Sequence, residues 1–210
     1  MKVASADERW AAEATRLYRR YEIEIEQALG LCPWAEPARR AGKVGERVVL
    51  DPRETSLEFP PHIEVAVLIF PRLNVGPSEF DRFVARLRDE DAARHPLGAI
   101  PFAMAAFHPD APLDKSQPER LIPFLRRTPD PTIQIVRTTV LDRVRSGAPQ
   151  GTSFVNFASL DLAAAAQPPL RERIARANLA RVEQVGVAEV ERKLADIRRD
   201  REETYARLAL

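Results

Sequence analysis

Residues 63–70, Ile-Glu-Val-Ala-Val-Leu-Ile-Phe, contain the longest apolar run of the chain, which extends from position 65 to position 70. β-Branched and other apolar residues fill this run, and polar and apolar positions hardly alternate, as is typical of a strand buried on both faces. We therefore predict a central strand here. The run is far shorter than the ~20 residues that span a bilayer, so the sequence predicts no membrane contact.

A helix and a short strand are predicted before this central strand. Residues 8–29 are good helix formers, and an apolar or aromatic residue recurs at every fourth position from 17 to 29, which draws one stripe along a helix. Gly30 follows this stripe, and glycine commonly ends a helix. Residues 44–50 are predicted to form the short strand.

A helix and a second apolar strand are predicted after the central strand. Pro77 and Ser78 open a helix whose one face is aromatic and aliphatic, and residues 100–107 are again apolar. A strand, a helix and a strand in this order predict a right-handed crossover that joins two parallel strands.

The last third of the chain is predicted to be mainly helical. Thr128 and Pro129 indicate a helix start, and the residues that would share one face of that helix, ending before Gly147, are Ile133, Val136, Val140 and Val144. Residues 152–160 are interpreted as a short strand or a loop. Residues 169–208 are predicted to form two helices, or one helix kinked near Gly186. The predicted fold class is α+β or α/β: a small mixed sheet containing one parallel βαβ unit, helices packed against it, and a helical C-terminal extension over residues 169–210.

Composition restricts the classes of partner. The chain has 210 residues, 45% of them hydrophobic, which is enough for one core, so residues 1–210 are predicted to form a single domain. A formal net charge of +1 with 30% charged residues predicts no attraction to nucleic acid or anionic lipid. One cysteine and no apolar secretion signal predict a cytoplasmic protein.

The lone cysteine, Cys32, lies between Gly30 and Pro33. A thiol at the N-cap of a helix faces unpaired N–H groups and the positive end of the helix dipole, which lower its pKa and favour the thiolate. Pro37 weakens this interpretation because it removes a further N–H group. The alternative is a small buried cysteine with a structural role.

His108 directly follows the predicted strand over residues 100–107 and precedes Pro109. Ligands of parallel sheets collect beyond the carboxyl ends of the strands, where an imidazole can act as a base, an acid or a ligand. The alternative is a histidine that caps the strand with one hydrogen bond.

Arg126 and Arg127 precede the helix predicted to start at Thr128, where two guanidinium groups would attract a phosphate or a carboxylate. The alternative is a solvated arginine pair with Asp130 as its counter-charge.

Three short segments, taken together, resemble a bacterial family of uncharacterised proteins, a domain of unknown function. That family is marked by LCPFA or LCPWA, by FHP, and by an RSPYP-like segment followed by a helix with an arginine. Here residues 31–35 read LCPWA, residues 107–109 read FHP and residues 127–131 read RTPDP, with Arg137 downstream. The resemblance spans roughly residues 15–145.

The resemblance implies that Cys32, His108, Arg127 and Arg137 belong to one shared site. Gln134 stands where the family often carries histidine, and because this imidazole is missing, no multi-histidine metal centre is predicted. The connection over residues 51–61 is also shorter than is usual in the family. Trp34 and Gln134 complete the candidate substrate contacts. The family brings no established activity and implies no particular cofactor.

Three functions compete for this candidate site. The first is a thiol-dependent enzyme in which Cys32 is the nucleophile, His108 its acid/base partner, and Arg127 and Arg137 hold a small anionic substrate. The second is a haem- or metal-binding protein that uses Cys32 and His108, since Cys-Pro is similar to short haem-regulatory motifs. The third is a non-enzymatic interaction module whose C-terminal helices mediate self-association or contact another protein.

The sequence lacks the motifs of two further enzyme classes, nucleotide-dependent enzymes and serine hydrolases. The sequence contains neither fingerprint of a glycine-rich phosphate loop, and it lacks a Gly-x-Ser-x-Gly nucleophile elbow. Nucleotide-dependent and serine-hydrolase functions are therefore not proposed.

Overall fold

The fold is built on a four-stranded mixed sheet with strand order β1-β2-β4-β3. The computed structural model describes residues 4–31, 35–95, 100–114, 116–145 and 170–209. The strands are β1 (Val44–Val48), β2 (Val65–Ile69), β3 (Phe102–Phe107) and β4 (Thr132–Arg137). The prediction for residues 152–160 lies outside the described residues.

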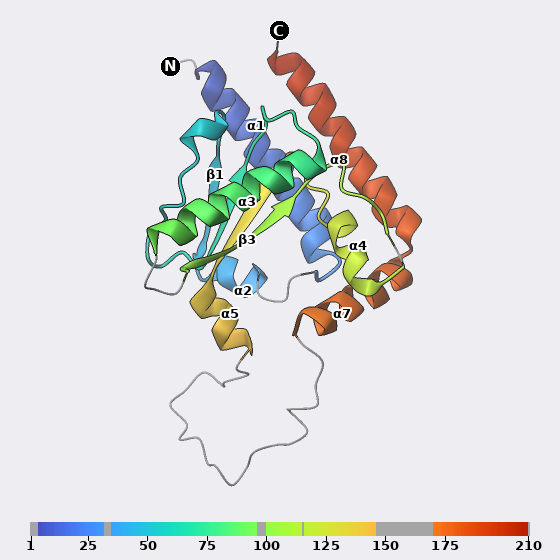
Figure 1. The fold of residues 1–210 in the computed structure, drawn as a ribbon. Helices are drawn as coiled ribbons and strands as arrows, with labels where there is room; N and C mark the ends of the chain where they lie inside the picture. The colour runs from blue at the N-terminus through green and yellow to red at the C-terminus, as the bar shows by residue number, and fades with distance from the viewer. Residues whose placement is uncertain (1–3, 32–34, 96–99, 115, 146–169, 210) are drawn as a thin grey trace.

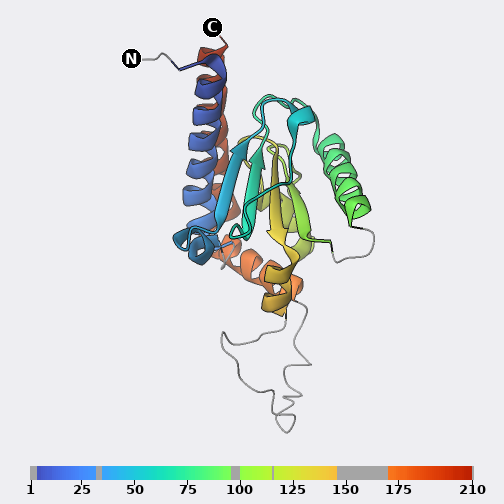
Figure 2. The same cartoon turned by 90° about the vertical axis from the view of Figure 1, so that its left-hand side faces the viewer.

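Helices cover both faces of the sheet. Figure 2 shows α1 and α8 side by side against one face and α3 against the other. The helical elements are α1 (Ala6–Tyr21), the π-helix η1 (Glu22–Gln27), α2 (Ala35–Arg40), the 3₁₀ turn η2 (Pro52–Glu54), α3 (Pro77–Arg94), α4 (Pro118–Leu125), α5 (Thr138–Arg145), α7 (Leu170–Val185) and α8 (Val187–Leu208). Figure 1 shows their order along the chain.

The predicted central strand is confirmed, because β2 lies inside the sheet between β1 and β4. β1 and β2 are parallel, and β4 runs antiparallel to both β2 and β3. β2 and β3 therefore point the same way, as expected from the strand-helix-strand order, but β4 lies between them. The mixed sheet with a parallel strand pair and a helical C-terminus agrees with the predicted α+β fold class.

The helix predicted to start at Thr128 is wrong. Residues 132–137 form β4, and α5 begins only at Thr138. Ile133 and Ile135 are buried on one face while Gln134 between them lies on the other, which is the alternation of a strand. The helical spacing of the four apolar residues is accidental: Ile133 and Val136 belong to β4, whereas Val140 and Val144 belong to α5, which follows the strand directly.

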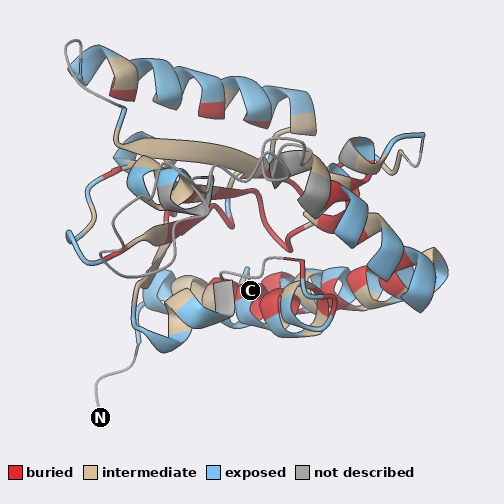
Figure 3. Ribbon diagram, turned by 90° about the horizontal axis from the view of Figure 1, so that it is seen from below, coloured by how far each residue is buried: buried red, intermediate tan, exposed pale blue. Residues whose placement is uncertain are grey.

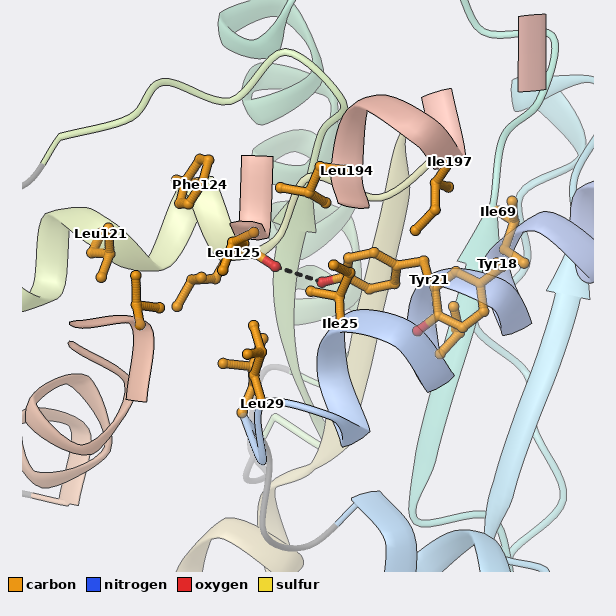
Figure 4. Packing of buried hydrophobic residues seen from close by; sticks show 14 of the residues in the cluster. Tyr18, Tyr21, Ile25, Leu29, Ile69, Leu121, Phe124, Leu125, Leu194 and Ile197 are labelled. Carbon is orange, nitrogen blue, oxygen red and sulfur yellow. Dashed lines mark hydrogen bonds between the residues drawn. The ribbon is translucent and has the colours of Figure 1, made fainter. Parts of the chain in front are cut away.

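Two hydrophobic cores lie on opposite faces of the sheet. On one face, Val67 and Ile69 pack against α1, η1, α4 and the C-terminal helices. Figure 4 shows Ile69 and labelled residues of these helices. On the other, Ala66 and Leu68 pack against α3. Figure 3 shows buried residues on the sides of the helices that face the sheet. We call the two faces of the sheet the α1 face and the α3 face, after the helices that cover them.

The N-terminal helix begins at Ala6, two residues before the predicted range, and it ends before Gly30 as the sequence predicts. Ser5 and Glu8 form a reciprocal capping box at its start. Its last part widens into the π-helix η1, and Gly30, with a φ of 60°, follows it in the left-handed conformation that glycine adopts without strain.

The C-terminal region forms two helices that meet at Gly186, where φ is 92°. The predicted apolar stripe is confirmed: Val190, Leu194 and Ile197 of α8 enter the core on the α1 face. Arg16 of α1 binds Asp200 of α8 at 2.8 Å. These apolar residues of α8 are thus packed against the rest of the chain. Among the described residues, no helix is both long and apolar enough to span a membrane.

Candidate functional site

Glu22 and Glu26 lie one turn apart on the π-helix η1. Glu22 is only 3% exposed, and Glu26 is partly buried. π-Helices are rare and often occur at functional sites. Two carboxylates brought inward on such a helix need positive partners, because a buried unpaired charge is costly.

Arg39 of α2 supplies the nearest positive charge. Its guanidinium forms an ion pair with Glu22 and another with Glu46 of β1, the latter at 2.7 Å between Nη1 and Oε1. Glu46 is in register with Val67, so its side chain lies on the α1 face. Arg39 therefore links η1 to the sheet.

Arg126 supplies a second positive charge from the end of α4. Its guanidinium carbon lies 4.6 Å from the centre of the Phe107 ring. Burial raises the pKa of Glu26 and that of Tyr21, and the charge of Arg126 partly offsets both shifts. The Tyr21 hydroxyl donates to the Leu125 carbonyl at 2.7 Å, which holds the end of α4 against α1 (Figure 4). We call Glu22, Glu26, Arg39, Glu46 and Arg126 the carboxylate–arginine cluster.

Burial raises the pKa of Glu26 to about 7. The negative charge of Glu22 contributes to this shift, whereas Arg39 and Arg126 oppose it. Burial also raises the pKa of Glu22, against the effect of its ion pair with Arg39. The pKa of Glu26 therefore lies near neutral pH, in the range that suits a group that transfers protons.

Cys32 and Trp34 lie outside the described residues, but the chain on both sides of them borders the cluster. The N–H of Leu31 donates to the Glu26 carbonyl at 2.9 Å. α2 begins at Ala35 and carries Arg39. Both ends of the segment over residues 32–34 are thus attached to elements that hold charges of the cluster.

Gln134 lies on the same side of the sheet as the cluster. In the register of β4 it stands opposite Val67 of β2 and Ala105 of β3. Since directly opposed residues share a face, its side chain is on the α1 face. Arg126, which the sequence singles out with Arg127, belongs to the cluster, and Gln134 lies on the same face of the sheet.

His108 is buried, and both of its ring nitrogens bind the backbone. Nε2 lies 2.9 Å from the Val75 carbonyl, and Nδ1 accepts the N–H of Asp110 at 3.1 Å. A carbonyl only accepts and an N–H only donates, so these bonds define the neutral tautomer with its proton on Nε2. A substrate, a metal or a haem iron would have to displace one of these bonds.

Arg127 and Arg137 both donate to backbone carbonyls, and they lie far apart. Arg127 Nε binds the Ala111 carbonyl at 2.6 Å, near His108. Arg137 Nε binds the Ile63 carbonyl at 2.6 Å, at the opposite end of β4. Arg137 stacks on Phe102, on the α3 face, away from Gln134. The structure does not bring Arg137 together with Arg127 and His108.

The two expectations for the segment around Asp130 need correction. Arg126 and Arg127 do not precede a helix, because β4 follows them. Asp130 is not a solvated counter-charge: it is 1% exposed and accepts hydrogen bonds from Arg201 and Tyr205 of α8, each at 2.7 Å. Its role is to hold the C-terminal helix.

Two open grooves border the carboxyl ends of β1 and β2, where the sequence places a site. One of about 460 Å³ lies between η2 and α3, and one of about 540 Å³ lies beside Arg72. At these grooves Arg53 pairs with Asp51 at 2.5 Å, and Arg72 pairs with Asp7 at 2.7 Å. The described residues contain no group of three or more potential metal ligands.

No family model matches the chain, and no curated protein or solved structure matches it either. Function therefore has to be inferred from the geometry of the site.

The sequence does contain a signal for Glu22 and Glu26, because both glutamates lie within one turn of the apolar stripe that includes Tyr21 and Ile25. A charged residue next to such a stripe is held close to the core by its apolar neighbours, and there it needs a partner of opposite charge.

Proposed function

We propose that the protein is an enzyme that transfers a proton to or from a small anionic substrate at the carboxylate–arginine cluster. The observation that carries this proposal is the raised pKa of Glu26, which is about 7. Its carboxyl is partly buried and belongs to a π-helix. A general acid or base is most effective when its pKa lies near the working pH. Glu26 is the proposed catalytic residue.

The arginines explain why the substrate is proposed to be an anion. When Glu26 is protonated, Arg39 and Arg126 balance the charges of Glu22 and Glu46. A bound anion disfavours the charged form of Glu26 and so favours its acid form. After Glu26 gives up its proton, the positive charges of Arg39 and Arg126 stabilise the carboxylate that remains. Gln134, on the same face of the sheet, is the proposed neutral contact.

Cys32 is proposed as the thiol of the same site. Its neighbour Leu31 is bonded to the Glu26 backbone, and α2 brings Arg39 to the cluster. His108, Arg127 and Arg137 stay proposed site residues from the sequence resemblance, with their side chains engaged by the backbone in this arrangement. Glu26 replaces His108 as the proposed acid/base partner because its carboxyl titrates near neutrality.

The pH dependence of Cys32 alkylation tests whether the thiol lies at the cluster. A nearby negative charge disfavours the thiolate and a nearby positive charge favours it. We expect Glu26→Gln to lower, and Arg126→Gln to raise, the pH midpoint of the iodoacetamide rate by about 0.5 to 1 unit. Because the chain has one cysteine, the rate reports a single site.

Arg126→Lys is the matched control, since it keeps the positive charge and is expected to leave the midpoint within about 0.3 unit of the wild type. His108→Gln distinguishes the two proposed partners. A midpoint that moves in His108→Gln but not in Glu26→Gln or Arg126→Gln would place the thiol with the histidine and overturn the assignment to the cluster.

Anion binding provides a second test, with acetate as the probe because its charge does not change near neutral pH. Bound acetate favours protonated Glu26, so binding takes up a proton and weakens as the pH rises through about 7. We expect acetate to bind up to about tenfold more tightly at about pH 6 than at about pH 8, measured by NMR titration.

In Glu26→Gln this pH dependence is expected to disappear, because the side chain can no longer take up the proton. Arg126→Gln is expected to weaken acetate binding at both pH values. Acetate binding that is equally tight at both pH values in the wild type, or that Arg126→Gln leaves unchanged, would contradict the proposed anion site.

A further inference from the structure

β3 forms one edge of the sheet and differs in character from the opposite edge, β1. None of the six residues of β3, Phe-Ala-Met-Ala-Ala-Phe, is charged. β1 carries Glu46, which pairs with Arg39, and Arg47, which donates to the carbonyls of Ser56 and Glu58. Charged side chains and covering loops protect edge strands from pairing with other chains, and the side chains of β3 supply no such charge.

The register shows which backbone groups of β3 point outward. The Thr138 N–H bonds the Pro101 carbonyl, and bonded pairs in an antiparallel ladder alternate along the strand. Ala103 and Ala105 therefore bond to β4, whereas the N–H and C=O groups of Phe102, Met104 and Ala106 face away from it. Within the described ranges, no backbone hydrogen bond reaches these outward groups.

Apolar surface continues this edge at its start. Ile100, just before β3, is 45% exposed although it is a large aliphatic residue. The side chains of Phe102, Met104 and Ala106 pack toward α3 on one face, so they leave their outward backbone groups at the rim of the sheet. The edge thus combines unpaired backbone groups with neutral side chains.

We propose that β3 pairs antiparallel with β3 of a second copy of this chain, so that two four-stranded sheets join into one across a two-fold axis. The occupant follows from charge: a neutral strand meets no like charge when it faces itself, and a charged partner strand would find no opposite charge on the β3 side chains. With the axis at Met104, Phe102 of one copy faces Ala106 of the other, which allows about six backbone hydrogen bonds.

The test is the mass in solution of the wild type, Ala106→Pro and Ala106→Ser, measured by light scattering after size exclusion. Proline removes the outward N–H of Ala106 but no bond to β4, and it is tolerated on edge strands. We expect twice 23.6 kDa for the wild type and for Ala106→Ser, and 23.6 kDa for Ala106→Pro. Circular dichroism checks that each variant is folded.

Hydrogen exchange of the wild type keeps the proposal testable if Ala106→Pro fails to fold. The amides of Phe102, Met104 and Ala106 are expected to gain protection as protein concentration rises over about a hundredfold range, because pairing obeys mass action. A wild type that stays at 23.6 kDa over that range would overturn the proposal. Protection of these amides in a protein of 23.6 kDa would also overturn it, since another part of the same chain would then cover the edge.

Discussion

Asp130→Ala is expected to lower the free energy of unfolding by about 3 kcal/mol. The Asp130 carboxylate accepts from Arg201 Nε and from the Tyr205 hydroxyl, each at 2.7 Å. Burial raises the pKa of Asp130, and Arg201 is the main group that offsets this effect. Removing the carboxylate leaves a guanidinium and a hydroxyl without their partner, and α8 loses its attachment to the start of β4.

Urea unfolding at neutral pH measures this effect, with Asp110→Ala as the matched control. Asp110 also binds an arginine of α8, Arg198, at 2.8 Å, but both side chains are more than half exposed. Exposed ion pairs contribute about 0 to 1 kcal/mol, so the control should unfold almost like the wild type. Equal losses in the two variants would show that Asp130 does not anchor the helix.

Glu26→Gln is expected to stabilise the protein, and to do so increasingly as the pH rises. The folded pKa of Glu26 is about 7, whereas the ordinary pKa of a glutamate is 4.5. Between these values the folded state holds a proton that the unfolded state releases, so wild-type stability falls as the pH rises through this window. The gain from glutamine should be about 2 to 3 kcal/mol larger at about pH 8 than at about pH 5.

Glu24→Gln on the same π-helix is the control for this prediction. Glu24 faces outward and pairs with Arg20 at 2.6 Å, so its replacement should change stability by no more than about 1 kcal/mol at either pH. A gain in Glu26→Gln that is the same at both pH values would mean that the carboxyl is not held protonated by its surroundings. Catalytic groups commonly carry such a cost in stability.

The sequence predicted best those elements whose local pattern has one interpretation. The run over residues 63–70 became β2, and the stripe that ends before Gly30 became α1 and η1. β4 was mistaken for a helix because apolar residues of the strand and of α5 combine into a helical spacing. The alternation of Ile133, Gln134 and Ile135 was the competing signal.

The candidate site was harder to predict because it depends on tertiary contacts. Glu22, Arg39 and Arg126 come from three elements, and their charges gain significance only where these elements meet beside the sheet. The motif resemblance implied that His108 and Arg137 share one site, but their side chains bind backbone carbonyls at distant points of the fold. Asp130 was misinterpreted for the same reason, since its partner Arg201 is 71 residues away.

The most direct test of the proposed acid/base site is a ¹³C NMR titration of the Glu26 side-chain carboxyl in the wild type and in Glu22→Gln. We expect a midpoint at about 7 in the wild type. It should be lower in Glu22→Gln, because the neighbouring negative charge that disfavours the carboxylate is gone. A wild-type midpoint near 4.5, the ordinary pKa of a glutamate, that is unchanged in Glu22→Gln would contradict the proposal that Glu26 transfers protons in this cluster.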